Sequence, residues 1–211
     1  MEYETEEQQV EALKAWWDEN GRAVIAGVVL GAAAIGGWTF WQDRQERLAV
    51  AASDGWSETM TAVAAGDGAR VASLADALAD DHEGSLYAAY ANLAAARVAV
   101  EAGELETAAE RLGWVAEHAP QDDVRLIANV RLARIEGANG DPAGALARLP
   151  SSYPESFAGL VEEARGDLLV QSGDVEGARA AYELARASGN VADADALTMK
   201  LNELAVAESA S

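Results

Sequence analysis

The chain has 211 residues, a net charge of −21 and no cysteine. Without cysteine there are no disulfides, thiol nucleophiles or thiolate zinc sites, and so negative a chain repels the phosphates of nucleic acids and anionic lipids, which argues against DNA or RNA binding. Half of the residues are hydrophobic, many of them alanine, and β-branched residues do not alternate with polar ones. This composition predicts an all-α protein.

The first predicted element is an apolar helix at residues 23–42. This segment contains no charged residue over 20 positions, and a helix of that length spans roughly 30 Å, the thickness of a membrane hydrocarbon core. Trp16 and Trp17 precede it, and Trp38 and Trp41 close it. Tryptophan is enriched at both membrane interfaces. We therefore predict an acidic head at residues 1–22, a transmembrane helix at 23–42 and a body at 43–211.

Two alternatives apply to the apolar segment. A cleaved signal peptide begins with a short basic region and ends with small residues, whereas here an acidic head comes first and bulky Trp38-Thr39-Phe40-Trp41 comes last. A buried helix of a soluble core is the second alternative, because alanine and glycine dilute the hydrophobicity. The pattern as a whole favours a membrane span.

Small residues recur along this segment at helical spacing. Gly27 and Gly31 form a GxxxG pair, which allows close approach of a second transmembrane helix, although glycine is also simply common in membrane helices. Lys14 and Arg22 lie before the span, and Arg44 and Arg47 lie after it. The positive-inside rule therefore gives a tie and leaves the orientation open.

The body contains four similar short segments, each with a glycine followed by an acidic residue. The glycines are Gly66, Gly103, Gly140 and Gly173, at spacings of 37, 37 and 33 residues. Glycine suits the left-handed residue that ends a helix, and an acidic residue suits the start of the next helix. The spacing predicts a solenoid of tetratricopeptide-like helix pairs, whose unit is about 34 residues. A generic alanine-rich bundle is the alternative.

The period places the helices of the body. They are predicted at 56–65 with 69–79, 85–102 with 105–118, 123–139 with 142–149, and 155–172 with 175–188. A last helix at about 191–207 carries Leu197, Leu201 and Leu204 on one face and would close the stack.

The first helix of each pair is expected to line a binding groove. Equivalent positions in two successive units hold the groove candidates, which are Tyr90, Leu93, Arg97, Ile127, Val130 and Arg134. An apolar surface with two arginines suits an extended peptide or an acidic partner segment. The alternative is that Arg97 and Arg134 only pair with neighbouring acidic residues.

Catalytic motifs are not found. The sequence contains no GxSxG, GxxxxGK[ST] or GxGxxG, and neither of its two histidines, His82 and His118, has a partner at i+3 or i+4 in a metal-site pattern. The acidic run Asp80–Glu83 is interpreted as a solvated junction between repeats. We predict a non-enzymatic binding protein with no cofactor and no metal.

The N-terminal residues resemble a known family. EALKAWWDENGR at 11–22, GVVLG at 27–31 and GGWTFWQ at 36–42 are similar to the YfgM-type ancillary subunit of the SecYEG translocon, and the head, span and repeat body follow the same order. The resemblance implies an inner-membrane protein with a cytoplasmic N-terminus and a periplasmic body.

The same resemblance implies partners. These are the SecYEG translocon, a membrane-anchored periplasmic chaperone resembling a peptidyl-prolyl isomerase, and unfolded exported proteins. The alternative function is a structural adaptor or scaffold of another cell-envelope complex.

Overall fold

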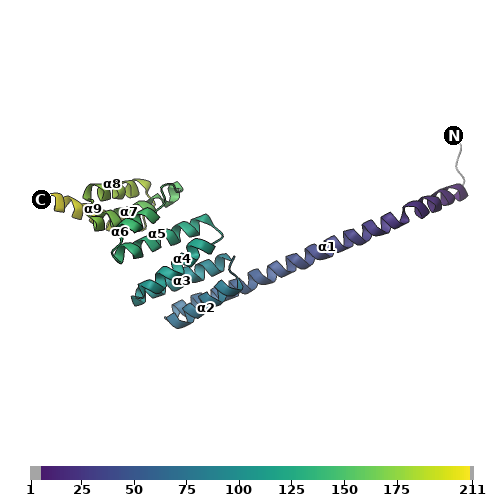
Figure 1. Cartoon of the computed structure of the whole chain (residues 1–211), viewed down its shortest axis with the longest axis horizontal. Coiled ribbons are helices and arrows are strands. Elements are labelled where there is room, and N and C mark those ends of the chain that lie inside the picture. Colours follow the sequence, from purple (N-terminus) through teal and green to yellow (C-terminus); the bar gives the residue numbers. More distant parts are fainter. Residues whose placement is uncertain (1–5, 210–211) are drawn as a thin grey trace. The chain divides into compact units, whose positions relative to one another are not determined.

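The computed structural model describes residues 6–209, and all regular structure within them is helical. The chain divides into two compact units, Met1–Val50 and Ala51–Ser211 (Figure 1). The helices are α1 (Glu6–Ala64), α2 (Gly68–Asp81), α3 (Leu86–Ala102), α4 (Leu105–His118), α5 (Asp122–Ala138), α6 (Pro142–Arg148), the short 3-10 helix η1 (Glu155–Phe157), α7 (Ala158–Ser172), α8 (Val175–Ser188) and α9 (Ala194–Ser209). This confirms the all-α fold class.

Helix α1 carries the apolar segment in full. Its most apolar window has a mean hydropathy of 1.9, and none of that window is buried against other parts of the described chain. Ile35 is 68% exposed and Trp38 is 62% exposed. A helix in a soluble core would be covered on at least one face, so this exposure argues against the buried-helix alternative. By its length and composition, this helix is one that could cross a membrane.

The structure differs from the sequence prediction at the start of the body. A separate helix was predicted at 56–65, whereas α1 continues without a break from Glu6 to Ala64. No proline interrupts residues 43–64, so nothing in the local sequence ends the helix before the turn at Gly66. The last turns of α1 belong to the second unit and bury Ala52 and Thr59 there.

The four predicted turn glycines have the predicted backbone conformation. Gly66, Gly103, Gly140 and Gly173 have positive φ angles of 69°, 79°, 95° and 83°, which is the left-handed region that residues with a Cβ avoid. At three of the four turns, an aspartate then accepts a hydrogen bond from the next helix's first turn; these aspartates are Asp67, Asp141 and Asp174. The repeat boundaries are therefore fixed by local chemistry.

The residue five places after each turn glycine packs into the core. Val71, Ala108, Ala145 and Ala178 are each 0% exposed. Small side chains at these places let the two helices of a pair approach closely. The closing helix α9 buries its predicted leucine face: Leu197, Leu201 and Leu204 pack with Tyr182.

The helices of the second unit follow one another in space as they do in sequence. Contacts join α2 to α3, α3 to α4, α4 to α5, α5 to α6, α6 to α7, α7 to α8 and α8 to α9, and α5 also contacts α7. The row from α2 to α9 is visible in Figure 1. Four buried clusters occur along it rather than one central core, as expected of a solenoid in which each repeat packs only on its neighbours.

Candidate partner-binding surface

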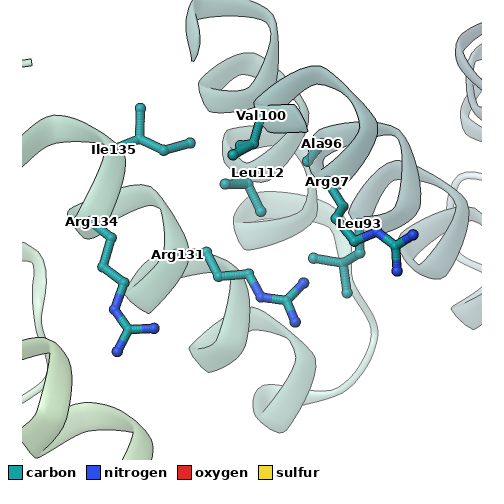
Figure 2. Close-up of a pocket in the computed structure, with 8 residues that line it drawn as sticks. All are labelled: Leu93, Ala96, Arg97, Val100, Leu112, Arg131, Arg134 and Ile135. Atoms are coloured by element: carbon teal, nitrogen blue, oxygen red, sulfur yellow. The ribbon is translucent and has the colours of Figure 1, made fainter. Parts of the chain in front are cut away.

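Two adjoining pockets lie on the body, and we call them together the arginine groove. The first, the aliphatic pocket, has a cavity volume of about 280 Å³ and lies among α3, α4 and α5. Its lining residues are Leu93, Ala96, Arg97, Val100, Leu112, Arg131, Arg134 and Ile135 (Figure 2). Most of the lining is aliphatic, so the pocket could hold an apolar side chain. Guanidinium groups of three arginines lie at its edge.

The second pocket, the aromatic pocket, has a volume of about 310 Å³. Its lining residues are Trp56, Met60, Val63, Tyr90, Leu93, Ala94, Arg97 and Arg131. The rings of Trp56 and Tyr90 lie 5.8 Å apart at a tilted angle of 53°, a favourable aromatic geometry. Leu93, Arg97 and Arg131 line both pockets, so the two form one continuous surface.

Three arginines meet on this surface. Arg97 comes from α3, and Arg131 and Arg134 come from α5, where a spacing of three residues places them on one side of the helix. Figure 2 shows the guanidinium of Arg131 lying between those of Arg97 and Arg134. Burial lowers the pKa of Arg131, and the positive charges of Arg134 and Arg97 lower it further. Three guanidinium groups therefore line one surface of a strongly acidic chain.

The acidic residues around these arginines neutralise them unequally. Nε of Arg97 lies 3.1 Å from Oε1 of Glu101, and both side chains are largely exposed. Nη2 of Arg134 lies 3.6 Å from Oδ2 of Asp167. Among the side chains of residues 8–205, no acidic group forms an ion pair with Arg131.

Asp167 is shared among several donors. Its Oδ1 accepts hydrogen bonds from Nζ of Lys200 at 2.7 Å and from the hydroxyl of Tyr182 at 2.8 Å. Lys200 also donates to Glu163 at 2.8 Å. Because closer donors already engage Asp167, it neutralises Arg134 only in part. The Nε of Arg134 is moreover buried with no hydrogen-bond partner.

The structure brings together four of the six predicted groove residues. Tyr90, Leu93, Arg97 and Arg134 all line the groove. The predicted pairing of both arginines with local acids also exists, although Arg97 keeps 63% of its side chain exposed. The groove and the local pairing are thus present together.

Ile127 and Val130 lie elsewhere. Ile127 is half-buried and lines neither pocket, and Val130 is 0% exposed within a cluster with Ala133 and Leu168. Val130 is therefore unavailable to a partner, which corrects its assignment as a groove residue. The reason is that α5 packs against α4, α6 and α7. Adding 37 to the residue numbers of the α3 groove positions assumed that α5 exposes the same face as α3, whereas less of the surface of α5 is exposed.

Sequence reasoning missed Arg131. It lies one residue after the position that the shift from Leu93 indicates. The available signal was its spacing of three residues from Arg134, which puts both on one face of a predicted helix.

The acidic run Asp80–Glu83 spans the C-terminal end of α2. Nε2 of His118 lies 3.3 Å from Oε1 of Glu83, a contact that is an ion pair only when the histidine is protonated. Among residues 8–205, whose side chains the structure describes, no group of three or more potential metal ligands occurs.

The fold and the groove together define a class of protein: a helical-repeat protein with one long apolar N-terminal helix and an open groove on its body. A family model described as "Tetratricopeptide repeat-like domain" matches residues 14–206. A relative from Escherichia coli (strain K12), named "Ancillary SecYEG translocon subunit", is 33% identical over 97% of this chain and 98% of its own length. A second protein of that name, from Haemophilus influenzae, is 29% identical over 94% of this chain and 97% of its own.

The chain belongs to the tetratricopeptide repeat-like family of ancillary SecYEG translocon subunits. The similarity covers the apolar helix and the body alike. No solved structure is significantly similar to the chain.

Proposed function

We propose that this chain is a non-catalytic, single-pass inner-membrane accessory of the Sec translocon. Residues 23–42 anchor it, and the body binds a membrane-anchored periplasmic chaperone of the peptidyl-prolyl isomerase type, newly exported proteins, or both. The observation that carries the proposal is the similarity to translocon subunits over 97% of the chain. The arginine groove supports it, because a body that acts by binding needs an accessible surface of mixed apolar and charged character.

A co-purification experiment tests the proposal. The full chain is extracted from the membrane in a mild detergent and isolated through an affinity tag, and its partners are identified by mass spectrometry. We expect translocon subunits in the isolated complex. Recovery of a cell-wall or secretion assembly in their place would identify the chain as a structural adaptor of another envelope complex.

The proposed topology has the N-terminus in the cytoplasm and the body in the periplasm. Charges flanking the span do not decide this, so the orientation depends on the family resemblance. An alkaline phosphatase fused to the C-terminus is expected to be active, because this enzyme folds only outside the cytoplasm. An inactive fusion, together with an active cytoplasmic reporter at the same position, would reverse the assignment.

The small residues of the span are proposed to contact another transmembrane helix. A Cβ added at Gly27 or Gly31 would meet no atom of the described chain within 4 Å, so Gly27→Leu combined with Gly31→Leu is tolerated by the fold and adds hydrophobicity. We expect the double variant to stay in the membrane but to co-purify less translocon, because leucine prevents close helix approach. Unchanged co-purification would place the membrane contacts elsewhere.

A further inference from the structure

The three arginines of the arginine groove are only partly neutralised by acidic side chains of the chain. Three guanidinium groups meet there in a protein whose net charge is −21. Two other arginines of the body have close acidic partners: Arg148 is paired with Glu136, and Arg165 with the buried Glu162. Arg131 differs from these, because it has no acidic ion-pair partner among the described side chains and lies on one surface with two further arginines.

The neutralisation of the flanking arginines is weak. The pair of Arg97 and Glu101 is exposed on both sides, and exposed pairs of this kind contribute little free energy and exchange readily for other partners. Asp167 is held by Lys200 and Tyr182 and reaches Arg134 only at 3.6 Å. All three guanidinium groups can therefore take a new acceptor without first breaking a strong interaction.

Apolar surface lies at both ends of this cluster. Leu112, Val100 and Ile135 line the aliphatic pocket, and Trp56, Met60 and Tyr90 line the aromatic pocket. Guanidinium groups bind carboxylates through paired donors, and the flanking pockets suit apolar side chains of the same ligand. An inorganic anion or a lipid phosphate would use the arginines but would leave the two pockets empty.

We propose that the arginine groove binds an extended, acidic segment of a partner protein, with Arg131 holding the central carboxylate and apolar side chains of the segment filling the pocket on each side. This inference rests on the proposed function, in which the body binds other proteins. It adds the chemistry of the ligand: carboxylates between apolar residues. Arg131 is thereby the residue that selects for negative charge.

The test measures binding of short fluorescent peptides to the full chain in detergent solution by fluorescence anisotropy. One peptide carries two glutamates flanked by leucine and phenylalanine, and the matched peptide carries glutamine in place of both glutamates. The protein variants are Arg131→Gln and, as a control with the same change of charge, Arg186→Gln. Arg186 lies on α8 outside the groove, with 57% of its side chain exposed.

We expect Arg131→Gln to lower the affinity for the glutamate peptide by roughly tenfold or more, the scale of one lost charged hydrogen bond. Arg186→Gln should leave this affinity within about twofold of that of the wild type, because salt screens the effect of a distant exposed charge. The glutamine peptide should bind wild type about as weakly as the glutamate peptide binds Arg131→Gln. The glutamine peptide should also bind Arg131→Gln nearly as well as it binds the wild type. The reason is that replacing the peptide glutamates and replacing Arg131 remove the same interaction.

Thermal melts of Arg131→Gln distinguish a lost ligand contact from a damaged fold. Removing a guanidinium that faces two others is expected to leave the melting temperature unchanged or raise it. Equal binding of the two peptides to wild type, or equal losses from Arg131→Gln and Arg186→Gln, would overturn the inference. Displacement of the glutamate peptide by inorganic phosphate at similar concentration would also overturn it, because the groove would then be a general anion site.

Failure of this inference is separable from failure of the proposed function. If the peptides are not discriminated but translocon subunits still co-purify with the full chain, only the assigned ligand chemistry is wrong. If the peptides are discriminated but no translocon subunit co-purifies, the groove chemistry stands and the assignment to the translocon fails.

Discussion

Replacing Gly159 by alanine is expected to destabilise the body by about 3 kcal/mol, at the upper end of overpacking effects. Gly159 is the second residue of α7, and an added Cβ would lie 2.4 Å from the carbonyl oxygen of Asn190 and 2.8 Å from the backbone nitrogen of Val191. These are backbone atoms of the segment that joins α8 to α9, so they cannot move aside as a flexible side chain would. Relief requires that segment to shift away from α7.

The control for this prediction is Gly113→Ala. Gly113 lies within α4, and an added Cβ there would meet no heavy atom within 4 Å. Alanine is favoured over glycine in a helix by about 0.5–1 kcal/mol, so this variant should be slightly more stable than wild type. Urea denaturation followed by circular dichroism measures both variants. Equal stability of the two would mean that α7 does not pack on the segment at 190–191 as described.

Reversing both outer arginines of the groove is expected to lower partner binding by roughly 2–4 kcal/mol. The double change Arg97→Glu with Arg134→Glu removes two guanidinium groups that could donate hydrogen bonds. It also adds two carboxylates that repel an acidic ligand. The cost to folding should be small. The exposed pair of Arg97 with Glu101 contributes little, and the lost contact of Arg134 with Asp167 is offset because Arg131 gains two acidic neighbours.

A matched control separates the groove from the overall charge. Arg70→Glu with Arg186→Glu changes the net charge by the same amount at two exposed arginines outside the groove. Partner affinity and melting temperature are measured for both double variants. A fall in melting temperature with unchanged affinity in the groove variant would show that Arg97 and Arg134 serve only to neutralise their acidic neighbours.

The regular parts of this fold could be predicted from sequence because local chemistry determines them. Positive φ angles occur at Gly66, Gly103, Gly140 and Gly173, where a glycine followed by an acid marked each turn. The buried residue five places after each glycine follows from the same register. Predicted helix ends therefore lie within a few residues of those observed, and the largest departures are at the starts of α1, α7 and α9.

The parts that escaped prediction depend on packing between helices. A period of 37 residues relates Leu93 to Val130, yet Leu93 lines the groove and Val130 is fully buried. The difference arises because α6 and α7 cover that side of α5, which no property of residue 130 reveals. The unpaired state of Arg131 was equally hidden, because it depends on which acids lie nearby in space. The unbroken course of α1 reflects the lack of any residue that would end it.

Site-specific crosslinking in living cells tests most directly whether the groove is where the body meets its partner. A photoreactive phenylalanine derivative replaces Tyr90, which is 36% exposed in the aromatic pocket, and in a second strain it replaces Leu184, which is 59% exposed on α8. We predict that the probe at position 90 crosslinks a translocon subunit or a translocon-associated periplasmic chaperone, and that the probe at position 184 does not. Crosslinks to those partners from position 184 alone, or equally from both positions, would contradict the account.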